Sequence, residues 1–238
     1  MSFEATYLGT NGWFIKFKKT NLLIDPWITG DLIFPPGEWF FKGSLENEIS
    51  IDKNINIILL TQGLPDHCHI PTLKQLRKDI PIICPKSASS TLEKLGFSSI
   101  KILQPSENTY QHYLSIKATA GAPVPLTENG YIVRDEEGNG FYIEPHGYLD
   151  KNLTKEDLDA VITPTKNLEL PFLGSFVKGA EVIPELIKTF NPKLILSSTV
   201  GGEVKYSGFL NKFITVKEYK EETNCEIVYL NSMQSIII

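Results

Sequence analysis

Three of the four histidines in this chain of 238 residues lie in two short polar segments. The first segment is Asp66-His67-Cys68-His69, and the second is Glu144-Pro145-His146. Each follows a mainly apolar run, residues 55–60 and 141–143, of the kind that forms a strand buried on both faces. Aspartate and histidine supply ligands that zinc, iron and manganese accept. We therefore expect a metal site where these two strands end, with a purely structural hydrogen-bond network as the alternative.

The composition is that of an ordinary globular chain and excludes several classes of function. Hydrophobic residues make up 42% and charged residues 21%, and the formal net charge is −5. No long basic run is present, so we expect no nucleic-acid partner. Residues 1–14 lack the pattern of a signal peptide, and no apolar run approaches the roughly 20 residues of a membrane span. With three cysteines and no Cys-x-x-Cys pair, we expect a cytoplasmic protein without disulfides or membrane contact.

Short apolar and β-branched runs separated by turn residues predict a chain rich in strands. We expect strands at residues 3–8, 13–17, 22–24, 55–60, 80–84, 100–103, 113–119, 131–134, 140–143, 160–163, 193–197, 226–230 and 235–238. We expect helices at residues 73–77, 87–95, 179–190 and 207–219. Three aromatic residues, Trp39, Phe40 and Phe41, follow a Pro-Pro-Gly turn and either pack inward or cover an entrance.

The order of these elements indicates two similar halves. In each half, strands joined by short turns come first and strand–helix pairs follow, so each half would form a sheet with helices on one side. The early turns are too short for parallel crossovers, which argues against a generic doubly wound sheet. We predict one domain over residues 1–238, an α/β fold built as a four-layer α/β/β/α sandwich. The last strand is expected at a sheet edge, which leaves a homo-oligomer open.

Four motifs in chain order resemble the metallo-β-lactamase superfamily. Residues 8–12, Leu-Gly-Thr-Asn-Gly, are similar to its opening glycine turn, and residues 22–26, Leu-Leu-Ile-Asp-Pro, to a strand end of the family. Residues 61–67, Thr-Gln-Gly-Leu-Pro-Asp-His, stand where the family has Thr-His-x-His-x-Asp-His, and residues 140–146 where a strand ends in Gly-Asp. The subgroup looks closest to the ascorbate-phosphate-lactonase-like branch. The resemblance covers most of the chain and implies the same sandwich.

The metal-binding motif of the family is degenerate in this chain. The resemblance implies two metals, the first held by both histidines of His-x-His and by one later histidine. Those positions hold Gln62 and Leu64, and the later one falls near Gly121 and Ala122. Leucine cannot bind a metal and glutamine is a poor ligand for soft metals, so the first site is expected to be absent. The distant histidine of the second site should fall near residues 197–199, where no histidine stands.

The positions that remain imply a site for one divalent metal. On this resemblance Asp66, His67 and His146 converge, because His146 takes the place of the bridging aspartate. Two imidazoles and one carboxylate are the ligand set of some zinc hydrolases and of mononuclear non-heme iron sites. Glu144 is expected nearby as a ligand or general base, and His69 as a ligand or an orienting residue. Asp25 is expected to stabilise the motif loop by hydrogen bonds.

Three functions are compatible with this ligand set. The first is a metal-dependent hydrolase of an ester, lactone or phosphoester, with one zinc ion, or iron or manganese, and with Asp66 or Glu144 as the group that takes the proton. The second is a non-catalytic relative that binds a small molecule or a partner and has lost the metal. The third is a mononuclear iron or manganese redox enzyme. A thiolate mechanism through Cys68 lacks an acyl-transfer constellation and is disfavoured.

Overall fold

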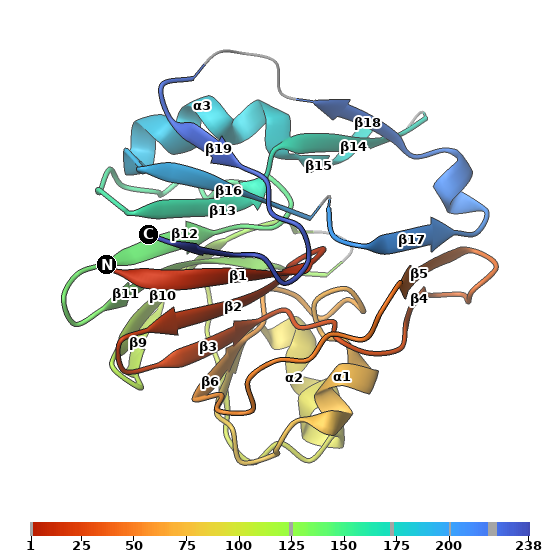
Figure 1. Ribbon diagram of the computed structural model, residues 1–238, viewed down its shortest axis with the longest axis horizontal. Coiled ribbons are helices and arrows are strands. Elements are labelled where there is room, and N and C mark those ends of the chain that lie inside the picture. Colours follow the sequence, from red (N-terminus) through yellow and green to blue (C-terminus); the bar gives the residue numbers. More distant parts are fainter. Residues whose placement is uncertain (1, 124–125, 172–173, 200, 219–222) are drawn as a thin grey trace.

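Two seven-stranded sheets form the centre of the computed structural model (Figure 1), which describes residues 2–123, 126–171, 174–199, 201–218 and 223–238. The strands of the first sheet, in spatial order, are β20 (Ser235–Ile237), β1 (Phe3–Gly9), β2 (Gly12–Phe17), β3 (Asn21–Ile24), β6 (Ile57–Leu59), β7 (Ile82–Cys84) and β8 (Ile100–Ile102). The strands of the second are β19 (Glu226–Val228), β16 (Leu194–Ser198), β13 (Ala160–Pro164), β12 (Gly140–Ile143), β11 (Asn129–Asp135), β10 (Leu114–Ala120) and β9 (Asn108–Gln111).

Both sheets follow the same plan. Four strands pair antiparallel in each sheet, β20-β1-β2-β3 in the first and β9-β10-β11-β12 in the second. Short turns join β1 to β2 and β2 to β3, whereas β20 comes from the C-terminal end of the chain and pairs with β1. Three parallel strands then extend each sheet, β6-β7-β8 after β3 and β13-β16-β19 after β12. Short turns allow antiparallel pairing, whereas parallel neighbours need a crossover. The two halves expected from the sequence are therefore present.

Helices cover the outer faces of the two sheets, which completes four layers (Figure 1). The helices α1 (Ile70–Gln75) and α2 (Lys86–Lys94) lie on the first sheet, and α3 (Gly179–Phe190) lies on the second. Each pair of layers encloses its own apolar cluster, and the largest lies between the two sheets. The predicted α/β/β/α sandwich is confirmed. In the described part of the chain, no helix has the length and apolar character needed to cross a membrane.

The core between the sheets is built from alternate residues of facing strands. Phe141 of β12 is fully buried, with its ring centroid 5.6 Å from that of Phe3 and 6.2 Å from that of Phe17. Residues that point away from this core in the same strands pack under the helices instead, as Leu23 and Ile58 do. The continuous apolar character of the parallel strands follows from this burial on both faces.

Two small sheets lie outside the sandwich and were not expected from the sequence. One contains β15 (Gly174–Lys178), β14 (Lys166–Leu170) and β18 (Thr215–Glu218), and the other contains β17 (Val204–Ser207), β5 (Phe41–Leu45) and β4 (Asp31–Phe34). The helix predicted at residues 207–219 is wrong, because a 3₁₀ turn (Leu210–Lys212) and strand β18 occupy this segment up to residue 218, and residue 219 lies outside the described part. Tertiary pairing with β14 overrides the local helical pattern. Trp39, at the turn between β4 and β5, is 66% exposed.

The ends of the parallel strands from both sheets meet at one edge of the sandwich. The backbone N–H of Asn129 donates to the carbonyl of Thr61, which follows β6, over 2.9 Å. The indole Nε1 of Trp13 donates to the hydroxyl of Ser198 at the end of β16 over 3.0 Å. These bonds between sheets fix the relative position of the two polar segments that the sequence analysis identified.

Replacing Phe141 by alanine tests the core between the sheets. We expect Phe141→Ala to lower the free energy of unfolding by about 3–5 kcal/mol, because it removes a large buried ring and leaves a cavity between the sheets. Phe209, which is 54% exposed, is the matched control, and Phe209→Ala should cost about 0.5 kcal/mol or less. Urea denaturation followed by circular dichroism measures both values, and equal losses in the two variants would contradict this description of the core.

Candidate metal centre

The ring of His67 is fully buried and is held at Nδ1 by Asp25. Asp25 follows β3 in a left-handed backbone conformation (φ 40°), and its carboxylate lies 2.8 Å from His67 Nδ1. The same carboxylate accepts hydrogen bonds from the Thr61 backbone N–H, over 2.8 Å, and from the Thr61 hydroxyl. These bonds agree with the loop-stabilising role expected for Asp25. Because Nδ1 donates to a carboxylate, the Nε2 atom of His67 is the one available as a ligand.

The Nε2 side of His67 faces Asp66 and Asn11. His67 Nε2 lies 3.2 Å from Asp66 Oδ2. Asn11 Nδ2 lies 3.2 Å from His67 Nε2 and 3.1 Å from Asp66 Oδ2. Burial by itself lowers the pKa of His67, but the carboxylates of Asp66 and Asp25 outweigh it and raise that pKa well above its usual value. Burial raises the pKa of Asp66, and the charge of His67 outweighs this and lowers it. The carboxylates of Asp25 and Asp66 thus favour a positive charge between them.

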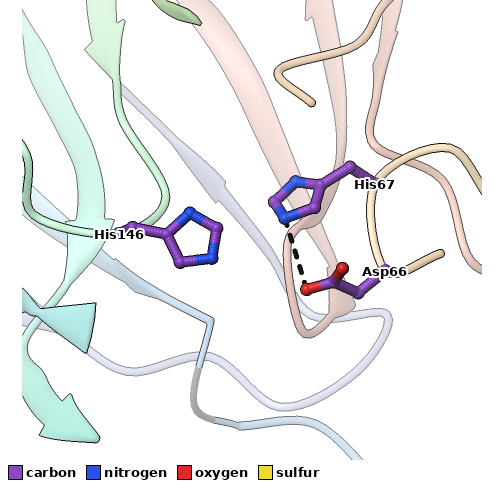
Figure 2. Close-up of side chains that lie close together, drawn as sticks. All are labelled: Asp66, His67 and His146. Carbon is purple, nitrogen blue, oxygen red and sulfur yellow. Dashed lines mark ion pairs between the residues drawn. The ribbon is translucent and has the colours of Figure 1, made fainter. Parts of the chain in front are cut away.

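His146 reaches the same point from the second sheet (Figure 2). Its ring centroid lies 5.2 Å from that of His67, and one ligand atom each of Asp66, His67 and His146 lie within 4.8 Å of one another. The Nδ1 atom of His146 contacts the carboxylate of Glu128, so Nε2 is the ring nitrogen that faces the other two residues. Burial, and then the charge of His67, lower the pKa of His146 to about 4. The ring is therefore neutral, as a metal ligand must be.

Glu144 is not a member of this group, which corrects its expected role as ligand or general base. Its side chain is fully buried, and its two oxygens accept the backbone N–H groups of His146, over 3.1 Å, and of Gly147. Burial, followed by the charge of Glu128, raises the pKa of Glu144 well above its usual value. Burial also raises the pKa of Glu128, to about 7. The raised pKa favours the protonated form of Glu144, and its two oxygens hold the backbone segment that carries His146.

His69 is not brought to the group either, so its expected role as a ligand is corrected. Its Nδ1 atom lies 3.0 Å from the Thr72 hydroxyl and accepts the Thr72 backbone N–H over 3.4 Å, which caps the first turn of α1. Its Nε2 atom lies 3.1 Å from the carbonyl oxygen of Asp31. Both ring nitrogens are therefore engaged. Burial lowers the pKa of His69, which keeps the ring neutral in this cap.

The positions of the missing family ligands are occupied by structural contacts. Gln62, which is buried, donates its Nε2 to the carbonyl of Leu126 over 2.6 Å, so it ties the motif loop to the segment before β11 that carries Glu128. At the end of β16, the hydroxyl of Ser197 lies 2.8 Å from that of Thr165. Asn11 and Glu128 are the site residues that the sequence analysis missed. A polar residue in the opening glycine turn was a usable signal for Asn11, whereas nothing in the spacing distinguished Glu128 from other acidic residues.

The chain belongs to the β-lactamase superfamily. A family model described as the beta-lactamase superfamily domain matches residues 4–198. The comparisons with solved structures agree with this assignment and define the fold as that of the metallo-β-lactamases. No curated protein sequence matches the chain.

Three solved structures illustrate the range of proteins with this fold. The chain is similar to a possible metal-dependent hydrolase from Veillonella parvula, with a TM-score of 0.69, 14% identity and 100% of both chains covered. It is similar to the metallo-β-lactamase fold protein YhfI from Bacillus subtilis, with a TM-score of 0.65, 12% identity and 100% of both chains covered. It is also similar to CmlA, a diiron β-hydroxylase from Streptomyces venezuelae, with a TM-score of 0.59 and 14% identity over 85% of this chain and 45% of that one.

Removing the charge of Asp25 tests whether it stabilises the motif loop. Asp25→Asn keeps the shape of the side chain but leaves His67 without its buried counter-charge, so we expect a loss of about 3–5 kcal/mol in the free energy of unfolding. The matched control is Asp79→Asn, because Asp79 is 73% exposed and pairs with exposed Arg77, and it should cost about 1 kcal/mol or less. Urea denaturation of both variants measures the difference, and a loss no greater than that of the control would contradict the role of Asp25.

Thiol reactivity tests the burial of Cys68 beside the site. Burial raises the pKa of Cys68 and of Cys84 to about 12, so both remain protonated thiols up to well above neutral pH. We expect neither to react with Ellman's reagent in the native protein at about pH 8, whereas both react after unfolding in guanidinium. Cys225 is the internal comparison, because its thiol is the least deeply buried of the three. Mass spectrometry identifies the labelled residues, and rapid native labelling of Cys68 would contradict this assignment.

Proposed function

We propose that this chain is a metal-dependent hydrolase of an ester, lactone or phosphoester, with a mononuclear site formed by Asp66, His67 and His146. One observation carries the proposal. Each histidine is bound at Nδ1 by a buried carboxylate, His67 by Asp25 and His146 by Glu128, and each directs Nε2 to the same point. Carboxylate–histidine pairs of this kind fix the ring orientation and the tautomer of metal-binding histidines.

The donor set fits one divalent cation. Two imidazoles and one carboxylate are the protein ligands of zinc hydrolases that keep a position open for water. The Oδ1 atom of Asp66 is buried and has no hydrogen-bond partner in the described part of the chain, which is unfavourable for a carboxylate oxygen unless a cation or a donor approaches it. Zinc is the metal that we propose, and iron and manganese accept the same ligands.

The residues of the chain have separate roles in this mechanism. A divalent cation held here supplies Lewis acidity and lowers the pKa of a water molecule towards neutrality. Asp25 and Glu128 hold the two imidazoles, and Glu144 fixes Glu128 and the backbone around His146. Asp66 keeps its charge because its pKa is lowered, and its partnerless Oδ1 is the atom that we assign to accept a proton during hydrolysis. The proposed substrate is a small molecule.

A second function, a binding protein without a metal, is favoured by one contact. His67 Nε2 lies within 3.2 Å of Asp66 Oδ2, and the raised pKa of His67 allows the two side chains to form an ion pair. A protonated histidine can then supply the positive charge that a metal supplies in related enzymes. In this alternative the retained fold binds a ligand or a partner and catalyses nothing.

Metal content after mutation of the histidines tests the proposal. We expect about one equivalent of metal in the parent protein and at least a tenfold lower metal affinity in His67→Ala and His146→Ala, since each loses one of the three protein ligands. His112→Asn is the matched control, because His112 is exposed and its left-handed backbone (φ 49°) suits asparagine. Elemental analysis of dialysed protein, with circular dichroism to confirm folding, measures this outcome.

Two results separate the candidate functions. Metal retention together with hydrolysis of chromogenic esters or phosphodiesters that is lost in both alanine variants supports the hydrolase. A parent protein that takes up none of zinc, iron or manganese after supplementation would contradict the hydrolase and favour the binding protein.

A further inference from the structure

Asn11 lies in the turn between β1 and β2 and is held there by the second half of the chain. The carbonyl of the preceding residue, Thr10, accepts the backbone N–H of Thr199 over 2.6 Å and the hydroxyl of Tyr7 over 3.0 Å. Thr10 itself adopts a left-handed conformation (φ 48°). The side chain of Asn11 is 2% exposed. The turn is thus fixed from both sheets, and its amide is placed inside the candidate metal centre.

The end of the Asn11 side chain forms a nearly equilateral triangle with two of the proposed ligand atoms. The sides are 3.1 Å from Asn11 Nδ2 to Asp66 Oδ2, 3.2 Å from Asn11 Nδ2 to His67 Nε2, and 3.2 Å between the last two atoms. Ligands bound at about 2.1 Å lie about 3.0 Å apart in an octahedral arrangement and about 3.4 Å apart in a tetrahedral one. The three atoms therefore have the spacing of one face of a coordination polyhedron.

The amide of Asn11 can present either of its two atoms at this corner. Its Oδ1 atom is buried and has no hydrogen-bond partner among the described residues, so none of them fixes the oxygen where it now lies. The nitrogen and oxygen of an asparagine amide exchange places by a half-turn of the side chain. In this structure, Nδ2 donates to Asp66 Oδ2. When a cation is present, a donor facing it is repelled, whereas the carbonyl oxygen is attracted.

We propose that Asn11 is a fourth protein ligand of the metal, binding through Oδ1 after this half-turn. This inference rests on the proposed metal site of Asp66, His67 and His146 and extends it by one residue. The resulting set contains two nitrogen and two oxygen ligands. An amide oxygen is a harder ligand than imidazole, so it moves the preference of the site towards Mn²⁺ and Fe²⁺ compared with a site of three histidines.

Metal titrations of three variants test the role of Asn11. Asn11→Leu removes the oxygen at similar volume, Asn11→Asp keeps an oxygen ligand but cannot donate a hydrogen bond, and Asn167→Leu is the control. Asn167 is also 1% exposed, but both ends of its amide bind residues of α3, namely Glu181 over 2.9 Å and the Ala180 backbone N–H over 2.9 Å. The metal-free proteins are titrated with Co²⁺ and Mn²⁺, and the visible spectrum of bound Co²⁺ reports its ligands.

We expect Asn11→Leu to weaken Co²⁺ binding at least about tenfold and to change the visible spectrum, as loss of a ligand does. Asn11→Asp should bind as tightly as the parent or more tightly, because a carboxylate oxygen replaces an amide oxygen. Asn167→Leu should leave affinity and spectrum unchanged even where it lowers stability.

Two results would overturn the role of Asn11 while leaving the proposed site intact. In the first, the parent binds Co²⁺ and Asn11→Leu binds it equally well with the same spectrum. In the second, Asn11→Asp loses as much affinity as Asn11→Leu, which would show that hydrogen-bond donation is what Asn11 provides. A parent that binds neither ion would refute the metal site and the role of Asn11 together. Asn11→Asp keeps the inference testable if Asn11→Leu does not fold.

Discussion

The contact between a buried carboxylate and a histidine Nδ1, made once from each sheet, is the interaction on which the site depends. Asp25 holds His67 and Glu128 holds His146, and each carboxylate is fully buried. A buried carboxylate is costly unless it is paired or hydrogen-bonded, so each of these residues keeps its imidazole in one orientation. That orientation directs both Nε2 atoms to one point. The other hydrogen bonds of the site hold these two pairs in place.

The repeated plan of the two sheets explains why the pairs meet. In each sheet, four antiparallel strands stand beside three parallel strands, and in each half of the chain a polar segment follows a central strand of the sheet. Stacking the sheets brings these strand ends to one edge, where the bond from Asn129 to Thr61 holds them together. The core between the sheets is apolar and large, so the fold does not need a metal for stability. The chain is therefore free to vary its ligands while it keeps the fold.

The polar residues around the site differ in what they contribute. Glu144 is fully buried and its oxygens accept the backbone N–H groups of His146 and Gly147, so it holds the segment that carries His146. His69 also has a structural role, because its side chain caps the N-terminus of α1. Asp66 and Asn11 are different from these two residues, because each has a buried oxygen with no hydrogen-bond donor among the residues that the structure describes. Partnerless acceptor oxygens beside two oriented imidazoles are the feature that connects the architecture of this site with cation binding.

Local patterns in the sequence determined most strands of the two large sheets, the two-half order and the presence of a polar cluster, because alternating and continuous apolar runs report burial directly. The segment 179–190 was predicted as a helix and is α3 (Gly179–Phe190), since its pattern and packing agree. The motif also identified Asp66, His67 and His146. Only the tertiary structure decided which nearby residues join them. His69 is two residues from His67 and Glu144 is two residues from His146, but both side chains contact other partners. Asn11 and Glu128 come from segments that are distant in sequence. Side-chain direction at a strand end depends on contacts between the two sheets, and those contacts are not encoded in local spacing.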